Sequence, residues 1–154
     1  MDFATVIPAP FGALGVACCT DAITEIRFLP PGTPARAPVC ALAHSAADQL
    51  ERWLRDASSP FDLPLAPAGT PFQQRVWAAI SAIPVGQRRS YGDLSVELHS
   101  AARAVGQACG ANPYPIVVPC HRVVAKHALG GFANARAGFL LETKQWLLRH
   151  EQCR

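Results

Sequence analysis

The chain has 154 residues, of which 50% are hydrophobic and 16% are charged. A chain this apolar can bury a core, so its composition excludes global disorder. No run approaches the ~20 apolar residues that a membrane-spanning helix needs. The first residues, Met1 to Ala4, lack the basic-then-apolar pattern of a secretory signal. We therefore expect a cytoplasmic protein with no membrane partner and with reduced thiols.

The charge divides along the chain. Residues 1–69 carry four arginines and seven acids, a net charge of −3, whereas residues 70–154 carry ten basic and four acidic residues, a net charge of +6. A basic part beside an acidic part indicates that the basic part meets a polyanion. Charge alone is weak support for nucleic-acid binding, and it favours the absence of such binding over its presence.

The first part of the chain is predicted to be a small sheet covered by a helix. Apolar or alternating runs predict strands over 3–7, 13–19 and 23–28, with a possible fourth over 61–63. Apolar residues at helical spacing predict a helix over 38–55. The stretch 64–69 is rich in Pro, Ala and Gly and coincides with the charge break. We place a domain boundary there, with an α/β lobe over 1–68 and a second domain over 69–154.

Helix start signals dominate the second part. Thr70, Pro71 and Gln73 together form a capping box. Ser90 is predicted to cap a short helix, and Ser100 to cap another over 101–109, which Gly110 stops. The last helix is expected over 142–151, with Trp146 and one of Leu147 and Leu148 buried. The two short helices in a basic region suggest a helix-turn-helix, although plain helix packing more often explains such spacing.

One proline-rich segment carries the chemistry. A buried strand is predicted over 116–118, and Pro119 must break it because proline donates no ladder hydrogen bond. Cys120 is then held on a bend, with His121 and Arg122 directly after it. A thiol attacks as thiolate, and a neighbouring imidazole and positive charge lower its pKa. From these residues alone, a catalytic cysteine and a buried structural cysteine are equally favoured.

The segment Pro119-Cys120-His121-Arg122-Val123, preceded by Asn112-Pro113, resembles the active-site signature of the O6-alkylguanine-DNA alkyltransferases, the methylated-DNA–protein-cysteine methyltransferases. Further blocks follow the family's order over residues 69–151: Gly69-Thr70-Pro71-Phe72-Gln73, Val76-Trp77, Ile83-Pro84-x-Gly86, Ser90-Tyr91, Arg103-Ala104-Val105-Gly106 and Trp146 to Glu151. The resemblance implies an α+β fold. It consists of an RNase H-like, strand-rich N-terminal lobe with a covering helix and a mostly helical, winged-helix-like DNA-binding domain.

The resemblance implies single-turnover DNA repair, in which an alkyl group moves irreversibly from O6 of guanine to Cys120. It leaves open whether O4-alkylthymine is also a substrate. His121 would act through a water as general base, Glu151 would orient the imidazole, and Asn112 would brace the turn that presents the thiol. The expected partner is double-stranded DNA, the protein is expected to be a monomer, and no cofactor is needed.

A base inside a duplex must be flipped out before its O6 can react, here through the minor groove. By resemblance, Arg103 fills the vacated stack and Tyr91 reaches the extruded base. Ala102, Gly106 and Arg122 are assigned to the same DNA-facing set. The guanine pocket would be built from Tyr91, Pro115, Val123, Phe132 and Ala133, with backbone carbonyls of Cys120 and Val123 facing the exocyclic amine and the Ala133 N–H facing O6.

The chain departs from the family pattern in three places. His99-Ser100 stands where the family usually has a Gly and a Pro, Phe132 replaces the usual Tyr, and residues 134–143 form a longer loop. Cys18, Cys19, Cys40 and His44 lack zinc-site spacing, so no metal is predicted. Cys109 and Cys153 are interpreted as inert packing or tail residues.

Three alternatives remain beside the repair hypothesis. The first is an alkyltransferase-like lesion sensor without catalysis, although such proteins lack the acceptor cysteine that is present here as Cys120. The second is a winged-helix transcriptional regulator, which would not need the Pro-Cys-His-Arg segment and would normally dimerise. The third is a cysteine hydrolase, a class that requires turnover.

Overall fold

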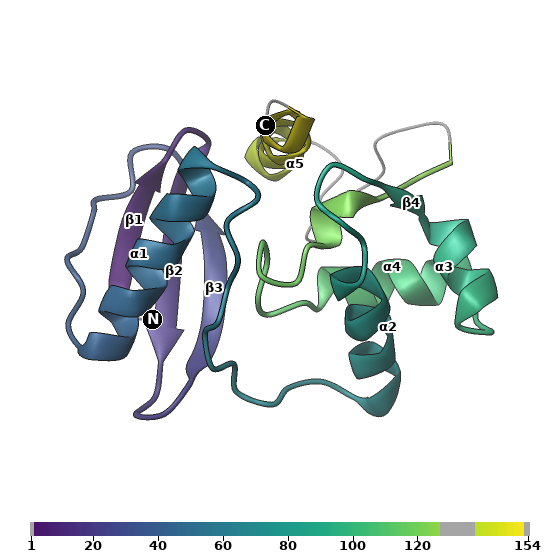
Figure 1. Cartoon of the computed structure of the whole chain (residues 1–154), viewed down its shortest axis with the longest axis horizontal. Coiled ribbons are helices and arrows are strands. Elements are labelled where there is room, and N and C mark those ends of the chain that lie inside the picture. Colours follow the sequence, from purple (N-terminus) through teal and green to yellow (C-terminus); the bar gives the residue numbers. More distant parts are fainter. Residues whose placement is uncertain (1, 127–137, 153–154) are drawn as a thin grey trace. The chain divides into compact units, whose positions relative to one another are not determined.

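The computed structural model describes residues 2–126 and 138–152, which divide into two compact units (Figure 1). The first unit runs to Pro67, and the second is Ala68–Gln152. Over these residues the fold is α+β, as predicted, with a three-stranded sheet, a two-stranded sheet and five α-helices. Within the described ranges, no helix combines the length and apolar character that crossing a membrane requires.

The first unit contains an antiparallel sheet in the order β1-β2-β3, formed by β1 (Thr5–Ala9), β2 (Gly12–Cys18) and β3 (Ile23–Leu29). Helix α1 (Ala41–Arg55) lies across one face of this sheet (Figure 1). The three predicted strands and the covering helix are confirmed. Side chains without exposed surface form the core between sheet and helix: Leu14, Val16, Ile23, Ala43, Ala46 and Leu50.

Two predictions in the first unit are corrected. The helix begins at Ala41 and not at residue 38, because Cys40 has extended backbone angles and serves as the N-cap. The strand predicted over 61–63 is wrong. Pairing occurs later instead, where Ile23 donates its N–H to the Pro64 carbonyl and accepts from Ala66, both at 2.8 Å. A proline carbonyl can accept in such a pairing, but proline has no N–H to donate. The pairing is therefore an isolated bridge between Ile23 and Leu65 and not a strand.

The second unit begins with α2 (Pro71–Ser81), and the predicted capping box is confirmed. The Thr70 hydroxyl accepts from the Gln73 N–H at 3.1 Å, and the Gln73 side chain accepts from the Thr70 N–H at 2.9 Å. Gly69 precedes the box with φ +82°, and a Cβ there would lie 2.5 Å from the Trp77 ring. The start of α2 is therefore fixed by local sequence alone.

Helices α3 (Tyr91–Glu97) and α4 (Ala102–Gly110) pack against each other and are joined by four residues. The Ser90 cap is confirmed, since its hydroxyl accepts from the Asp93 N–H at 2.9 Å. The Ser100 cap is wrong: the N-cap of α4 is Ala101, without a side-chain bond. The cause lies in His99, whose φ of 54° is left-handed and turns the Ser100 N–H back to the Ser95 carbonyl at 2.8 Å.

The segment before Cys120 is a buried turn, so the strand predicted over 116–118 is also wrong. Ile116 has φ 75°, a conformation that a β-branched residue rarely adopts. It lies in a turn that the Val118 N–H closes on the Tyr114 carbonyl at 2.8 Å. The apolar residues that suggested a strand therefore form a turn directly before Pro119 and Cys120, in which Ile116 and Val118 are buried.

The chain then forms a short 3-10 helix, η1 (Cys120–Arg122), and the strand β5 (Val123–Val124), which pairs in parallel with β4 (Arg89–Ser90). Helix α5 (Phe139–Gln152) packs against η1. It begins three residues earlier than predicted, and both Leu147 and Leu148 are buried. Trp146 is only half-buried and stacks on His150 with ring centroids 4.6 Å apart.

Candidate active site

The Cys120 thiol lies at the start of η1 and is 5% exposed. The Cys120 N–H is bonded to the Val118 carbonyl at 2.8 Å, which fixes the bend. The Asn112 amide donates to that same carbonyl at 2.9 Å and lies 3.2 Å from the Cys120 sulfur. Its oxygen accepts from the Tyr114 N–H at 2.9 Å. Asn112 thus connects both ends of the turn to the thiol that it presents.

Cys109, at the end of α4, shares a hydrogen bond with the Cys120 thiol. This bond and burial raise the pKa of Cys120 well above its usual range, while the amide of Asn112 and the charge of Lys144 oppose them. The same bond lowers the pKa of Cys109. The interpretation of Cys109 as inert packing leaves out this effect on the pKa of Cys120. It is part of the surroundings of the thiol, which no local sequence pattern indicated.

His121 and Glu151 come together from η1 and α5. The His121 Nε2 lies 3.0 Å from Glu151 Oε2, and the two side chains are 0% and 1% exposed. Burial lowers the pKa of His121, against the raising effect of Glu151. An imidazole with a lowered pKa is neutral near pH 7 and is able to accept a proton. The predicted pairing of these two residues is present in the structure.

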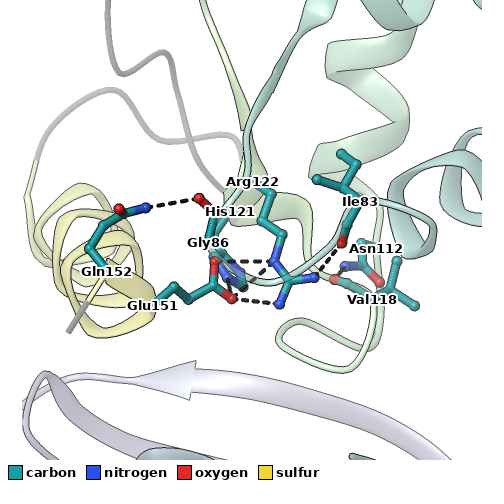
Figure 2. A network of polar contacts seen from close by, with 8 residues as sticks. All are labelled: Ile83, Gly86, Asn112, Val118, His121, Arg122, Glu151 and Gln152. Carbon is teal, nitrogen blue, oxygen red and sulfur yellow. Dashed lines mark hydrogen bonds and ion pairs between the residues drawn. The ribbon is translucent and has the colours of Figure 1, made fainter. Parts of the chain in front are cut away.

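Arg122 lies in this buried network and not on a DNA-facing surface, so its assignment to the DNA contacts is corrected (Figure 2). Its Nε lies 3.1 and 2.9 Å from the two Glu151 oxygens, and Nη2 lies 2.6 Å from Oε2. Nη1 donates to the Ile83 carbonyl at 2.6 Å. Burial alone would raise the pKa of Glu151, but hydrogen bonds from His121 and Arg122 outweigh it and lower this pKa to about 2.

Lys144, a fully buried lysine on α5, was not predicted from the sequence to belong to the site. Its ammonium donates to the Val123 carbonyl at 2.8 Å and lies 5.8 Å from the centroid of the Tyr91 ring. Burial lowers the pKa of Lys144 to about 8. A signal was available, because residues 144, 147, 148 and 151 have the spacing of one helix face. The lysine shares that face with the functional glutamate.

The proposed pocket residues fall partly within the described chain. Tyr91 is half-buried at the start of α3, and a Cβ on Gly106 of α4 would lie 3.9 Å from its ring. Pro115 and Val123 are buried within the two segments that flank Cys120. The Val123 carbonyl, expected to face guanine, already accepts from Lys144. Phe132 and Ala133 lie outside the described residues, as does Cys153.

Ala102 and Arg103 are both exposed in the first turn of α4. A small residue and a long cation thus stand together on a helix end of a basic unit, an arrangement suited to phosphate or groove contact. Gly106, on the same helix, is half-buried beside Tyr91. In the part of the chain that the structure describes, no group of three or more metal-ligating side chains has the arrangement to hold a metal ion.

Residues 71–153 match the family model described as 6-O-methylguanine DNA methyltransferase, DNA binding domain. The constitutive methylated-DNA–protein-cysteine methyltransferase of Bacillus subtilis is 46% identical over 110 residues, which cover 70% of this chain and 64% of the relative. The Salmonella typhimurium enzyme of that name is 52% identical over 92 residues, 58% of this chain and 51% of the relative. The chain thus spans about half to two thirds of these relatives.

Mycobacterial proteins match over nearly the whole chain. The methylated-DNA–protein-cysteine methyltransferase of Mycobacterium bovis is 37% identical over 155 residues, 96% of this chain and 91% of the relative. The crystal structure of Mycobacterium tuberculosis O6-methylguanine methyltransferase has a TM-score of 0.81 and 35% identity, covering 97% of this chain and 92% of that one. A Mycobacterium tuberculosis OGT solved in complex with DNA has a TM-score of 0.79, 35% identity and coverages of 96% and 91%.

Proposed function

The chain belongs to the family of methylated-DNA–protein-cysteine methyltransferases, and from this premise we propose that it repairs DNA by accepting an alkyl group from O6-alkylguanine on Cys120. One observation carries the proposal. In the unit that matches the family, a nearly buried thiol is held by Asn112 next to a buried His121–Glu151 pair. A structural cysteine needs neither an amide at its sulfur nor a neutral imidazole after it.

The transfer begins with the proton of the thiol. Because the bond with Cys109 and burial raise the pKa of Cys120, the thiol keeps its proton in the resting protein and needs a base to react. His121 is that base, by way of a water. Its Nε2 faces the Glu151 carboxylate, so Nδ1 is the ring nitrogen with the lone pair. The imidazolium that forms is stabilised by the same carboxylate.

The bond changes balance without a cofactor. Cys120 Sγ forms a bond to the alkyl carbon, and the bond between that carbon and O6 breaks. The electron pair of the broken bond stays on O6 of the nucleobase. The nucleobase then takes up a proton and is restored to ordinary guanine within the DNA strand. The thioether has no easy route back to a thiol, so each chain reacts once. Arg122 acts as a positioning residue in this scheme, because it holds Glu151 in place through its Nε and Nη2.

Access to O6 requires that the nucleotide leave the stack, which costs a few kcal/mol. We assign this task to the α3–α4 pair as a helix-turn-helix that lies in the minor groove. Exposed Arg103 fills the vacated stack, and exposed Ala102 lets the helix end approach the sugars. The base docks against Tyr91, Pro115 and Val123. Phosphate contacts give most of the affinity, which suits a protein that must search any sequence.

The chemistry is tested by mass spectrometry of the whole chain after incubation with a duplex carrying one O6-methylguanine. We expect one methyl group per chain, none with unmodified DNA and none in Cys120→Ala. Trypsin releases residues 104–122 as one peptide, which contains both Cys109 and Cys120. The reaction must therefore be repeated in Cys109→Ala, where the methyl should remain. Tight binding without transfer would instead support a lesion sensor, and methylation of Cys109 would move the acceptor.

The flipping role of Arg103 is tested by comparing substrates. We expect Arg103→Ala to slow transfer from the duplex strongly and transfer from the free base O6-methylguanine little. Arg149→Ala, which removes an exposed charge from α5, is the matched control. If Arg103→Ala lowers only the salt-dependent affinity, as one lost phosphate contact would, the finger role is wrong. A duplex with O4-methylthymine, used in competition, tests the second substrate.

A further inference from the structure

The first unit contains a pair of thiols that the repair reaction does not use. Cys18 ends β2 and Cys40 is the N-cap of α1, and their sulfurs lie 3.8 Å apart. Twenty-two residues separate them in sequence, so the fold and not the local chain brings them together. Two thiols are too few to enclose a zinc ion, which takes four ligands.

Cys40 has the surroundings of a reactive thiol. It is exposed, and its sulfur accepts from the Ala43 N–H at 3.5 Å in the first turn of the 15-residue helix α1. That backbone bond lowers the pKa of Cys40. Thiolates at helix N-termini are stabilised in this way, and the thiolate is the form that reacts with electrophiles and oxidants.

Cys18 has the complementary surroundings. Burial and the interactions with Cys40 raise its pKa, so it stays protonated while Cys40 ionises. It lies where the pairing of β2 with β3 shifts register, between Ala17 and Cys18. Both sulfurs are at ends of elements, and a disulfide requires that they move from 3.8 Å to the bonding distance of about 2.05 Å.

We propose that Cys18 and Cys40 form a reversible oxidation site, at which hydroperoxide oxidises Cys40 and Cys18 resolves the product to a disulfide. The Cys40 thiolate attacks one peroxide oxygen, the O–O bond breaks, and a sulfenic acid and hydroxide form. The Cys18 thiol then attacks the Cys40 sulfur, an S–S bond forms, and the hydroxyl leaves as water. In total the protein loses two hydrogens and one hydrogen peroxide becomes two waters.

The experiment uses the reduced full chain and hydrogen peroxide at limiting amounts, followed by a thiol-blocking reagent and trypsin under non-reducing conditions. Cleavage at Arg27 and Arg36 separates the two cysteines, so the disulfide appears as a crosslinked peptide pair that dithiothreitol releases. We expect complete loss of this species in Cys40→Ser, which keeps a capping oxygen for α1. In Cys18→Ser we expect a Cys40 sulfenic acid that dimedone traps.

Cys19→Ser is the matched control, because Cys19 is exposed and adjacent, yet its thiol donates to the Ala22 carbonyl at 3.5 Å. The crosslink must survive in this variant. Because Cys18 and Cys19 lie in the same tryptic peptide, its survival also shows that Cys18 is the crosslinked residue. A crosslink that disappears in Cys19→Ser, or peroxide oxidation of Cys19 before Cys40, would overturn the proposal. These outcomes do not depend on methyl transfer, since Cys120 lies in the other unit.

Discussion

Cys40 and Cys120 place the same side chain in opposite surroundings. Cys40 is exposed at a helix N-terminus and its pKa is lowered by a backbone N–H, whereas Cys120 is 5% exposed and its pKa is raised by Cys109 and burial. The first thiol is exposed and ionises more readily than an ordinary cysteine, which favours its reaction with small electrophiles. The second keeps its proton until a base removes it.

The contrast indicates how a thiol can be made selective. Under the proposed function, an acceptor that reacts once must not be consumed by dissolved electrophiles. A raised pKa withholds the thiolate, and the neighbouring base acts only when an alkyl carbon is in place. Low intrinsic reactivity is then part of the function, and the surrounding charges decide when it is overcome. Four sets of variants test which surroundings matter.

The largest effect is expected from Glu151→Gln. It removes the carboxylate that pairs with both Arg122 and His121 and leaves the buried guanidinium without a counter-charge. Breaking a buried pair in this way typically costs about 3–5 kcal/mol. We expect a loss of this size in urea unfolding, together with a loss of methyl transfer. Glu142→Gln, exposed at the start of α5, should change stability by less than about 0.5 kcal/mol.

The same carboxylate predicts an acid dependence. The pKa of Glu151 is about 2 in the folded chain against an ordinary 4.5, so its stabilisation is complete above pH 4.5 and is lost as the pH falls towards 2. The unfolding free energy of the native chain should decline more steeply over this range than that of Glu151→Gln. Parallel curves would show that Glu151 is not held as an ion.

The second prediction tests how strongly burial disfavours the charged form of Lys144, whose charge acts on Cys120. Because Lys144 titrates near pH 8 when folded and at 10.5 when unfolded, the folded chain bears the cost of its burial below pH 8. That cost, about 3 kcal/mol, is relieved as the pH rises to 10.5. Stability relative to Lys144→Met should rise by this amount over the range. Lys126→Met, which alters an exposed lysine, should leave the pH profile unchanged.

The sequence predicted elements well where local chemistry decides them. The capping box at Thr70 and the Ser90 cap depend on residues three apart, and both are present. The Ser100 cap and the strand over 116–118 failed because His99 and Ile116 adopt left-handed φ angles, which a β-branched residue such as Ile116 rarely adopts and which no local pattern at either position predicts. Such conformations are imposed by the surrounding fold, and propensity arguments do not include them.

The site residues also divide into those that the sequence predicts and those that only the fold brings together. The pairing of His121 with Glu151 and the bracing role of Asn112 followed from the family resemblance, since both residues stand in matching blocks. The resemblance assigns Arg122 to the DNA-facing set, whereas the structure pairs it with Glu151. Cys109 and Lys144 were missed, because the fold and not a local sequence pattern brings them close enough to influence the pKa of Cys120.

The third prediction concerns Asn112→Asp. The aspartate keeps an oxygen for the Tyr114 N–H but loses the amide that donates to Val118 and contacts the Cys120 sulfur. The Val118 carbonyl keeps its bond from the Cys120 N–H, so the loss of the Asn112 bond should cost about 0.5–1.5 kcal/mol. A carboxylate beside the thiol should raise the pKa of Cys120 further. We expect both effects, by urea unfolding and by the pH dependence of methyl transfer. Asn112→Ala also loses the amide that lowers the pKa of Cys120, but it adds no negative charge, so it should raise this pKa less than Asn112→Asp does.

The smallest effect is expected from Cys109→Ala, which should lower the pKa of Cys120 and so make this thiol more like Cys40. The bond with Cys109 is the largest of the influences that raise the pKa of Cys120, so Cys109→Ala should lower that pKa and increase the thiolate fraction at pH 7. We expect Cys120 to react with a small disulfide reagent up to about tenfold faster, which corresponds to one pKa unit. The site can be followed by peptide mapping while Cys40 provides an internal reference.

Cys109→Ser separates the hydrogen bond from the volume of the side chain. A serine hydroxyl can still accept from the Cys120 thiol, so the rate should stay near that of the native chain. If serine and alanine accelerate the reaction equally, the thiol is protected by packing and not by the shared bond. If neither variant accelerates the reaction, burial alone keeps the thiolate fraction of Cys120 low. The difference from Cys40 is then a difference in solvent exposure.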